Sequence, residues 1–246
     1  KSHAETALKI NDQASEAHYN LGNALFAEGS ATSAAKAFKR ALELDPENQI
    51  HWANYLFALN FTAAASPEDI YGANKAWGEK LAKTVPMLPD FTNELTTERR
   101  LRLAYFLPEL DSHVTSRFLH PILASHNKTI FEVSLYGSRA DGAEPPANLI
   151  AAADHWIDVG DKSAAEIAAL MRADQIDIFA HPCTFKSRYR EVLAHRAAPV
   201  QIACTNLVST SGLTATDYLI TDDFISPPGA GDDFFTEQLI RLSGFN

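Results

Sequence analysis

Residues 15–48 read SEAHYNLGNALFAEGSATSAAKAFKRALELDPEN, and this stretch decides the fold of the first part of the chain. It contains two helical segments that are separated at Gly29, and Asp45-Pro46 ends the second segment. Small residues would let the two helices approach closely, and large apolar residues would fill the seam between them. The small residues are Gly22, Ala34 and Ala41, and the large ones are Leu21, Leu25 and Phe38. The stretch therefore predicts a tightly packed helical hairpin.

The spacing of these residues is that of a complete tetratricopeptide repeat, with His18 in the position that tryptophan usually occupies. Residues 4–8 fit the second helix of a preceding unit. A third unit opens at Gln49 with Trp52 in the aromatic position, but it does not complete, so we expect a capping helix there. Repeats need neighbours to bury their faces, and the chain begins inside a unit without a methionine. We therefore expect the array to continue upstream and to hold protein segments.

A further amphipathic helix is predicted over residues 66–84. Ser66 is a good N-cap, Pro67 suits the first helical position, and apolar residues recur at helical spacing after them. Residues 85–93 contain two prolines and are typical of a linker. We therefore expect repeats at residues 1–62, a linker-helix region at 63–98 and a second type of fold at 99–246.

After residue 99, short β-branched or aromatic segments alternate with helical patterns. The predicted strands are 101–107, 131–137, 155–160, 176–182, 200–205 and 217–222, and the predicted helices between them are 115–125, 163–175 and 187–195. This alternation predicts an α/β lobe, a Rossmann-like parallel sheet with helices on both faces. Ligands of such sheets bind beyond the carboxyl ends of the strands. The loops expected to matter are therefore 107–114, 137–146, 181–187 and 205–213.

Composition argues against several classes of function. The formal net charge is −10 and 46% of the residues are hydrophobic, which argues for a substantial core and against nucleic acid or an anionic membrane as the main partner. Residues 188–190 (Arg-Tyr-Arg) nevertheless suggest a small basic site. No apolar run approaches the roughly 18 residues of a membrane span. Cys183 and Cys204 lack metal or redox spacing, so we interpret them as reduced core thiols of a cytoplasmic protein, and we expect no metal.

His113 follows the first predicted strand and directly precedes a predicted helix, with Glu109 and Asp111 nearby. An imidazole with an ordinary pKa near 6.5 suits proton transfer at neutral pH. The residue could therefore act as a general base, donate a hydrogen bond to an anionic ligand, or simply form the entry to a helix.

Two more loops at the carboxyl ends of strands carry candidate ligand-binding residues. Thr184, Lys186 and Arg188 follow the fourth strand, where a polar, basic loop could bind phosphate or sugar but could equally be a capped helix start. Thr210, Ser211 and Gly212 follow the fifth strand, where hydroxyl groups suit a sugar, although a turn also explains them. The chain lacks the G-x-G-x-x-G, P-loop and G-x-S-x-G motifs, so a complete dinucleotide or P-loop site is unsupported.

Taken together, the repeats, the linker helix and the strand loops resemble the O-linked N-acetylglucosamine transferase and SPINDLY family, in particular its bacterial members. The similar segments are 54–80, 99–123, 131–137, 151–159, 167–178 and 194–229. The resemblance implies a repeat superhelix joined to a two-lobed, metal-independent glycosyltransferase of the GT-B type, whose second lobe holds most of the nucleotide-sugar donor. This chain would then carry the last repeats and the first lobe, and would be inactive alone.

The resemblance also bears on single residues. His113 falls on the histidine of the first lobe that is considered catalytic or substrate-positioning in the family. Three loops depart from the family pattern: Glu109-Leu110 replaces an aspartate–phenylalanine pair, residues 182–185 replace a glycine-[His/Tyr]-threonine loop, and residues 206–209 replace leucine-glycine-tyrosine-proline. Thr184 and residues 210–212 retain parts of those motifs. The sugar or acceptor could therefore differ from the family's, or catalysis could have been lost.

The function that the resemblance implies is inverting transfer of a sugar from a nucleotide-sugar to serine or threonine of proteins held by the repeats. The expected donor is UDP-N-acetylglucosamine, although plant SPINDLY relatives use fucose, and no cofactor is expected. Two alternatives stay open at this point. One is a catalytically degenerate lobe that only supports a protein-binding array, and the other is a glycosyltransferase with a non-protein acceptor.

Overall fold

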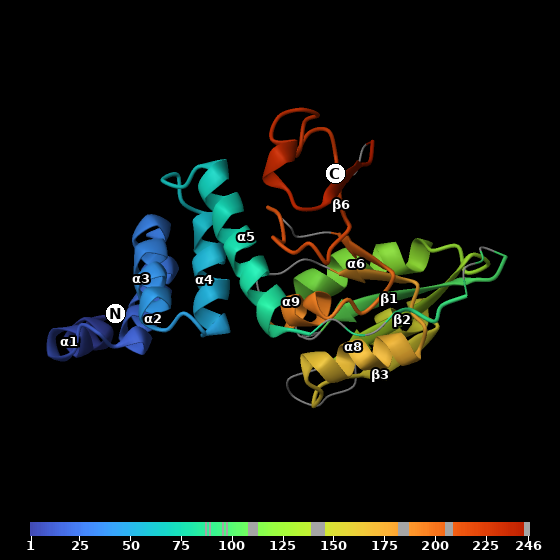
Figure 1. Ribbon diagram of the computed structural model, residues 1–246, viewed down its shortest axis with the longest axis horizontal. Coiled ribbons are helices and arrows are strands. Elements are labelled where there is room, and N and C mark those ends of the chain that lie inside the picture. The colour runs from blue at the N-terminus through green and yellow to red at the C-terminus, as the bar shows by residue number, and fades with distance from the viewer. Residues whose placement is uncertain are drawn as a thin grey trace.

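The computed structural model describes residues 1–86, 88, 90–94, 96, 98–107, 113–138, 146–181, 187–204 and 209–243. A row of helices leads into a sheet that helices cover on both faces (Figure 1). The helices that precede the sheet are α1 (Ser2–Ile10), α2 (Ser15–Ala27), α3 (Ala31–Leu44), α4 (Gln49–Leu59) and α5 (Pro67–Thr84). None of the helices among the described residues has both the length and the apolar character that crossing a bilayer requires.

The helical hairpin predicted for residues 15–48 is confirmed by α2 and α3. Gly29 follows Glu28, the C-cap of α2, and adopts a left-handed φ of +79°, where glycine avoids steric strain. A Cβ atom at Gly22 would lie 2.6 Å from the ring of Phe38, so only glycine lets the two helices meet here. Ser66 and Asp69 form a reciprocal capping box at the start of α5, as the N-cap signal predicted.

The second part of the chain forms one parallel sheet of seven strands among the described residues. The strands are β1 (Leu101–Leu107), β2 (Phe131–Gly137), β3 (His155–Asp158), β4 (Ile178–His181), β5 (Val200–Ala203), β6 (Tyr218–Thr221) and β7 (Gln238–Arg241). Their spatial order is β3-β2-β1-β4-β5-β6-β7, and every pair is parallel. The first six strands have the order of the Rossmann fold. The α/β fold class is therefore confirmed.

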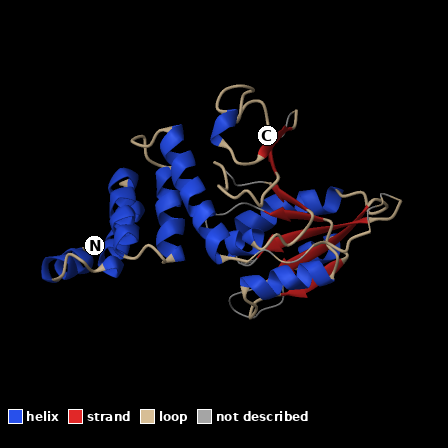
Figure 2. Ribbon diagram, viewed as in Figure 1, coloured by secondary structure: helices blue, strands red, loops and turns tan. Residues whose placement is uncertain are grey.

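The two faces of the sheet pack against different helices (Figure 2). Along β1, Ala104 and Phe106 belong to a cluster with α5, α8 (Ala164–Ala173) and α9 (Ser187–Ala194). Leu103, Tyr105 and Leu107 point to the other face, which α6 (His113–Ser125) and α7 (Ala147–Ala152) cover. The first cluster also includes Phe38 and Leu56, so the core of the repeats continues into the core of the lobe without a break.

Several elements differ from the sequence-based expectation. Helix α6 begins at His113, two residues earlier than predicted, and α7, the short 3-10 helix η1 (Asp232–Phe234) and β7 were not predicted. Helix α7 spans only six residues, and strand β7 has only four, alternating between exposed and half-buried. Elements this short carry too few apolar residues for a periodic signal.

Candidate functional site

The candidate site lies where the strand order of the sheet reverses. Strand β1 sits between β2 and β4, and ligands of open α/β sheets bind in the crevice beside such a switch point. His113, at the first position of α6, follows the carboxyl end of β1, as predicted. Its side chain, together with Thr184, Lys186 and Cys183, lies outside the described residues, so the proposed roles of His113, Thr184 and Lys186 stay predictions.

His181 ends β4 at this same edge and was not identified as a candidate from the sequence. Its side chain is fully buried, and neither ring nitrogen has a hydrogen-bond partner among the residues that the structure describes. The ring contacts that of Phe179, with the two centroids 5.7 Å apart. Burial, helped by the cationic Arg190, lowers the pKa of His181 to about 3. The imidazole is therefore neutral at physiological pH.

The lowered pKa of His181 predicts a pH-dependent stability. Below its ordinary pKa of about 6.5 the unfolded chain takes up a proton at this residue, but the folded chain does not until about pH 3. The free energy of unfolding should therefore fall by about 1.4 kcal/mol between neutral pH and pH 5.5 because of this residue. Urea unfolding of wild type and His181→Leu at pH 7.5, 6.5 and 5.5 checks this. The unfolding free energy of the variant should fall less between pH 7.5 and pH 5.5, by the contribution of His181.

Burial also lowers the pKa of His126. Wild type and His181→Leu both contain His126, so its contribution cancels when their unfolding free energies are compared. Leucine has nearly the volume of histidine and leaves no buried polar atom, so the variant should fold. Identical pH slopes for wild type and variant would contradict the prediction.

Arg188 holds a neighbouring loop in the structure. One of its terminal guanidinium nitrogens donates to the backbone carbonyl groups of Val159, at 2.6 Å, Gly160, at 3.3 Å, and Lys162, at 2.5 Å. These residues directly follow β3, so Arg188 ties the carboxyl end of one strand to the helix that follows another. Its predicted contact with phosphate or sugar stays a prediction.

Residues 210–212 form a buried loop whose polar groups bond within the protein. The hydroxyl group of Thr210 donates to one carboxylate oxygen of Glu237, at 2.7 Å, and the backbone N–H of Ser211 donates to the other, also at 2.7 Å. The Thr210 hydroxyl oxygen also accepts from the N–H of Gly212, at 3.0 Å. All three residues are thus brought to the carboxyl side of β5, and their predicted contact with a sugar stays a prediction.

The prediction of a basic site at residues 188–190 is wrong for two of the three residues. Tyr189 is only 5% exposed and Arg190 is fully buried, so they offer no charge to the surface. Sequence reasoning also missed Glu237, which is 5% exposed. The spacing of charges along the sequence cannot show that helix α9 turns Arg190 inward against α5. Nor can it show that Glu237, the residue before β7, meets the loop of residues 210–212.

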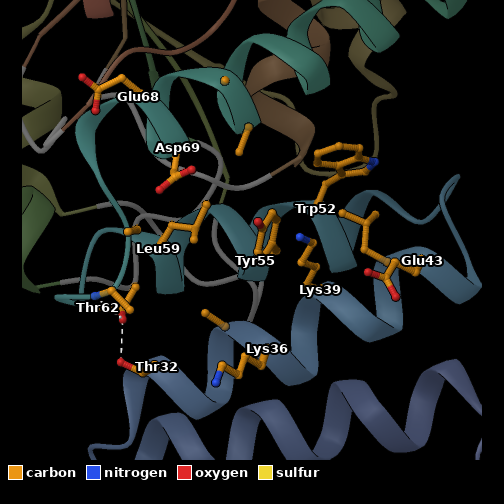
Figure 3. Close-up of a pocket in the computed structure, with 16 residues that line it drawn as sticks. Thr32, Lys36, Lys39, Glu43, Trp52, Tyr55, Leu59, Thr62, Glu68 and Asp69 are labelled. Atoms are coloured by element: carbon orange, nitrogen blue, oxygen red, sulfur yellow. Dashed lines mark hydrogen bonds between the residues drawn. The ribbon is translucent and has the colours of Figure 1, made fainter.

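A groove of about 690 Å³ lies apart from this edge, between helices α3, α4 and α5. Lys36 and Lys39 of α3 lie on one side, Glu68 and Asp69 of α5 lie on the other, and the aromatic side chains of α4 lie between them (Figure 3). The hydroxyl groups of Thr32 and Thr62 are hydrogen-bonded at one end. The α3 wall also carries Glu43, so the groove offers lysines and a carboxylate on one side, carboxylates on the other and an apolar floor, which suits an extended polypeptide.

Cys204 directly follows β5 and is a free, buried thiol, as the sequence predicted for a core cysteine. Burial raises its pKa to about 12, and its S–H donates weakly to the backbone carbonyl group of His181, at 3.5 Å. Such a thiol is unreactive at neutral pH. Among the described residues, no three His, Cys, Asp or Glu side chains gather closely enough to hold a metal ion.

Comparison with known proteins places both parts of the chain. Residues 15–48 match the tetratricopeptide repeat, and residues 80–244 match glycosyl transferase family 41. Over 98% of this chain, the structure resembles a mutant of the O-GlcNAc transferase of Thermobaculum terrenum, with a TM-score of 0.86 and 32% sequence identity, and covers 46% of that chain.

Two relatives illustrate the sequence similarity. The chain is 28% identical over 84% of its length to the probable UDP-N-acetylglucosamine–peptide N-acetylglucosaminyltransferase SPINDLY of Oryza sativa subsp. japonica, of which it covers 23%. It is 30% identical over 69% of its length to the UDP-N-acetylglucosamine–peptide N-acetylglucosaminyltransferase of Caenorhabditis elegans, of which it covers 15%. The chain thus spans about a quarter or less of the length of these relatives. With its repeat hairpin, Rossmann-type strand order and match over residues 80–244, the chain belongs to glycosyl transferase family 41.

Proposed function

We propose that the protein takes part in transfer of a sugar from a nucleotide-sugar to serine or threonine side chains of proteins that its repeats hold. The observation that carries this proposal is the direct attachment of a repeat array to a sheet of Rossmann type through α5. N-acetylglucosamine is the sugar that the names of the relatives favour. A cytoplasmic location belongs to the same proposal and is supported by the free, buried thiol of Cys204.

Transfer with inversion needs in-line placement of the acceptor hydroxyl group, removal of its proton and stabilisation of the leaving diphosphate. His113 stands after the carboxyl end of β1, at the switch point of the sheet. From there an imidazole could orient the hydroxyl group or accept its proton. The donor itself is a substrate, so the proposal requires neither a cofactor nor a metal.

The groove between α3, α4 and α5 is the proposed site for part of the acceptor protein. Its volume of about 690 Å³ accommodates several residues of an extended chain. The lysines of α3 and the carboxylates of α5 can each pair with charges of the bound segment, while Trp52 and Tyr55 can pack against its apolar side chains.

We expect His113→Ala in the full-length protein to lower the rate of transfer at least about tenfold, the low end of a general-base contribution. The measurement is incorporation of label from UDP-N-acetylglucosamine into proteins of a lysate. His120→Ala is a matched control, because it removes a half-buried imidazole from the same helix α6, and it should retain the wild-type rate. Unchanged transfer by His113→Ala would remove this residue from the mechanism.

A second candidate is a protein-binding module whose lobe has lost catalysis. The loop at residues 210–212 favours this candidate, because its polar groups bond within the protein instead of facing a sugar. The hydroxyl group of Thr210 donates to Glu237 and accepts from the N–H of Gly212. Incubation of the full-length protein with labelled nucleotide-sugars distinguishes the candidates. Label on protein supports the proposed transfer, with UDP-N-acetylglucosamine and GDP-fucose as the donors to compare. Label on glycan alone indicates a non-protein acceptor, and failure to bind any donor indicates the binding module.

A further inference from the structure

The loop of residues 209–213 is held between two buried groups of opposite charge. On one side, Glu237 accepts hydrogen bonds from Thr210 and from the backbone of Ser211, both at 2.7 Å. On the other side, the guanidinium group of Arg190 donates to the backbone carbonyl group of Ser211 at 2.6 Å. Hydrogen bonds to charged groups are stronger than neutral ones and fix geometry. The conformation of this loop therefore depends on both side chains.

Arg190 also connects the loop to α5. Its second terminal nitrogen donates to the side-chain oxygen of Asn74 at 2.9 Å, and its guanidinium carbon lies 4.3 Å from the ring centroid of Trp77. The indole N–H of Trp77 in turn donates to Gln49 at 2.6 Å. Arg190, Asn74 and Trp77 are all fully buried. A chain of contacts thus runs from the half-buried Gln49 of α4, through the buried side chains of α5, to the loop.

The backbones of α5 and the loop meet at two glycines. A Cβ atom at Gly78 would lie 1.8 Å from the carbonyl oxygen of Gly212, and a Cβ atom at Gly212 would lie 2.1 Å from the carbonyl oxygen of Asn74. Gly212 also has a left-handed φ of +71°. Neither position can hold a larger residue without moving the helix away from the loop, because the atoms that would clash are backbone atoms.

The same helix forms a wall of the groove described above. Glu68, Asp69 and Gly72 line the groove, whereas Asn74, Trp77 and Gly78 face the loop and Arg190. Helix α5 therefore carries the repeat-side groove on one face and residues 209–213 on another. A segment bound in the groove and a ligand beside the loop would keep a fixed distance from each other as long as this contact is intact.

We infer that Arg190 and Gly78 are positioning residues, which fix the loop of residues 209–213 to α5 and so set the spacing between the groove and the loop. Neither residue needs to touch a substrate. The structural part of the inference stands on the contacts alone, and its consequence for transfer rests on the proposed function.

Hydrogen exchange of this chain tests the structural part. Gly78→Ala should lower the protection of the backbone N–H groups of Ser211, Gly212 and Leu213 at least about tenfold, because the added methyl group forces α5 from the loop. Gly72→Ala is the matched control, since a Cβ atom there meets nothing within 4 Å, and it should leave this protection unchanged. Equal protection in Gly78→Ala and wild type would overturn the inference.

Arg190→Lys provides a second variant in case Gly78→Ala does not fold. Lysine keeps the charge but cannot present the planar fork that reaches Ser211 and Asn74 together. Protection of the three N–H groups should again fall, and protection that stays at the wild-type level in this variant would also overturn the inference.

Kinetics of the full-length protein test the consequence for transfer. Arg190→Lys should raise the KM for UDP-N-acetylglucosamine at least about fivefold and leave the KM for the protein acceptor unchanged, because the loop moves and the groove does not. Loss of folded protein would lower kcat but could not raise a KM, so an unchanged donor KM contradicts the positioning role. If wild type transfers no sugar, the proposed function fails, whereas the exchange result still decides the structural part.

Discussion

The Trp77→Ala variant should lose about 4 to 5 kcal/mol of unfolding free energy, near the top of the range for a buried aromatic side chain. Trp77 is fully buried, and its ring stacks on that of Trp52 with the centroids 6.4 Å apart and the planes 5° apart. Arg190 lies against the same ring system. Truncation would therefore open a large cavity and leave a buried cation without its aromatic neighbour. Urea unfolding followed by far-ultraviolet circular dichroism measures the loss.

Trp77→Phe is the matched control for this experiment. It keeps an aromatic ring in the site and removes the N–H group that donates to Gln49. The control should therefore lose clearly less stability than Trp77→Ala. A loss below about 2 kcal/mol for Trp77→Ala, well under the range for such truncations, would show that α5 is not the central packing element described here.

The second large effect is expected for Phe38→Ala, which should lower the free energy of unfolding by about 3 to 4 kcal/mol. Phe38 is only 2% exposed and fills the space that Gly22 leaves between α2 and α3. Its ring also packs against that of Tyr19, with the centroids 6.0 Å apart. Because glycine cannot expand into the cavity, the interface should relax little, and thermal melting should shift clearly downward.

Phe224→Ala is a control of the same chemistry at an exposed position. Phe224 is 90% exposed, so its truncation removes almost no buried surface. We expect a change within about 0.5 kcal/mol, as for surface substitutions in general. Equal losses for Phe38→Ala and Phe224→Ala would mean that the assigned repeat register is wrong.

The fold was largely predictable from the sequence because its signals are local. The repeat hairpin follows from small and large residues at fixed spacing, and α5 follows from Ser66, Pro67 and the apolar spacing behind them. The parallel sheet follows from strands that alternate with helices. In each case the pattern lies within a few turns of helix or one strand, where the period of apolar residues decides the structure.

The candidate site was predictable only as a set of loops. The sequence placed His113 and residues 210–212 after the correct strands, because the ends of strands are visible in the pattern. It could not show that His181 is buried with no hydrogen-bond partner in the described part of the chain, or that Arg190 points inward. Those properties depend on contacts between residues far apart in the chain, such as Arg190 with Asn74.

The core that passes unbroken from the repeats into the lobe has a consequence for protein engineering. Phe38, Leu56 and Trp77 share one cluster with Phe106 of the sheet, so the two parts should melt in a single transition. A foreign repeat array joined after α4 would replace Phe38 and Leu56 in this cluster, so we expect such a hybrid to lose stability unless its last helices pack equally well against α5. A chimaera joined upstream of α2 would keep the native junction and the groove between α3, α4 and α5, so only the repeats before α2 would be exchanged.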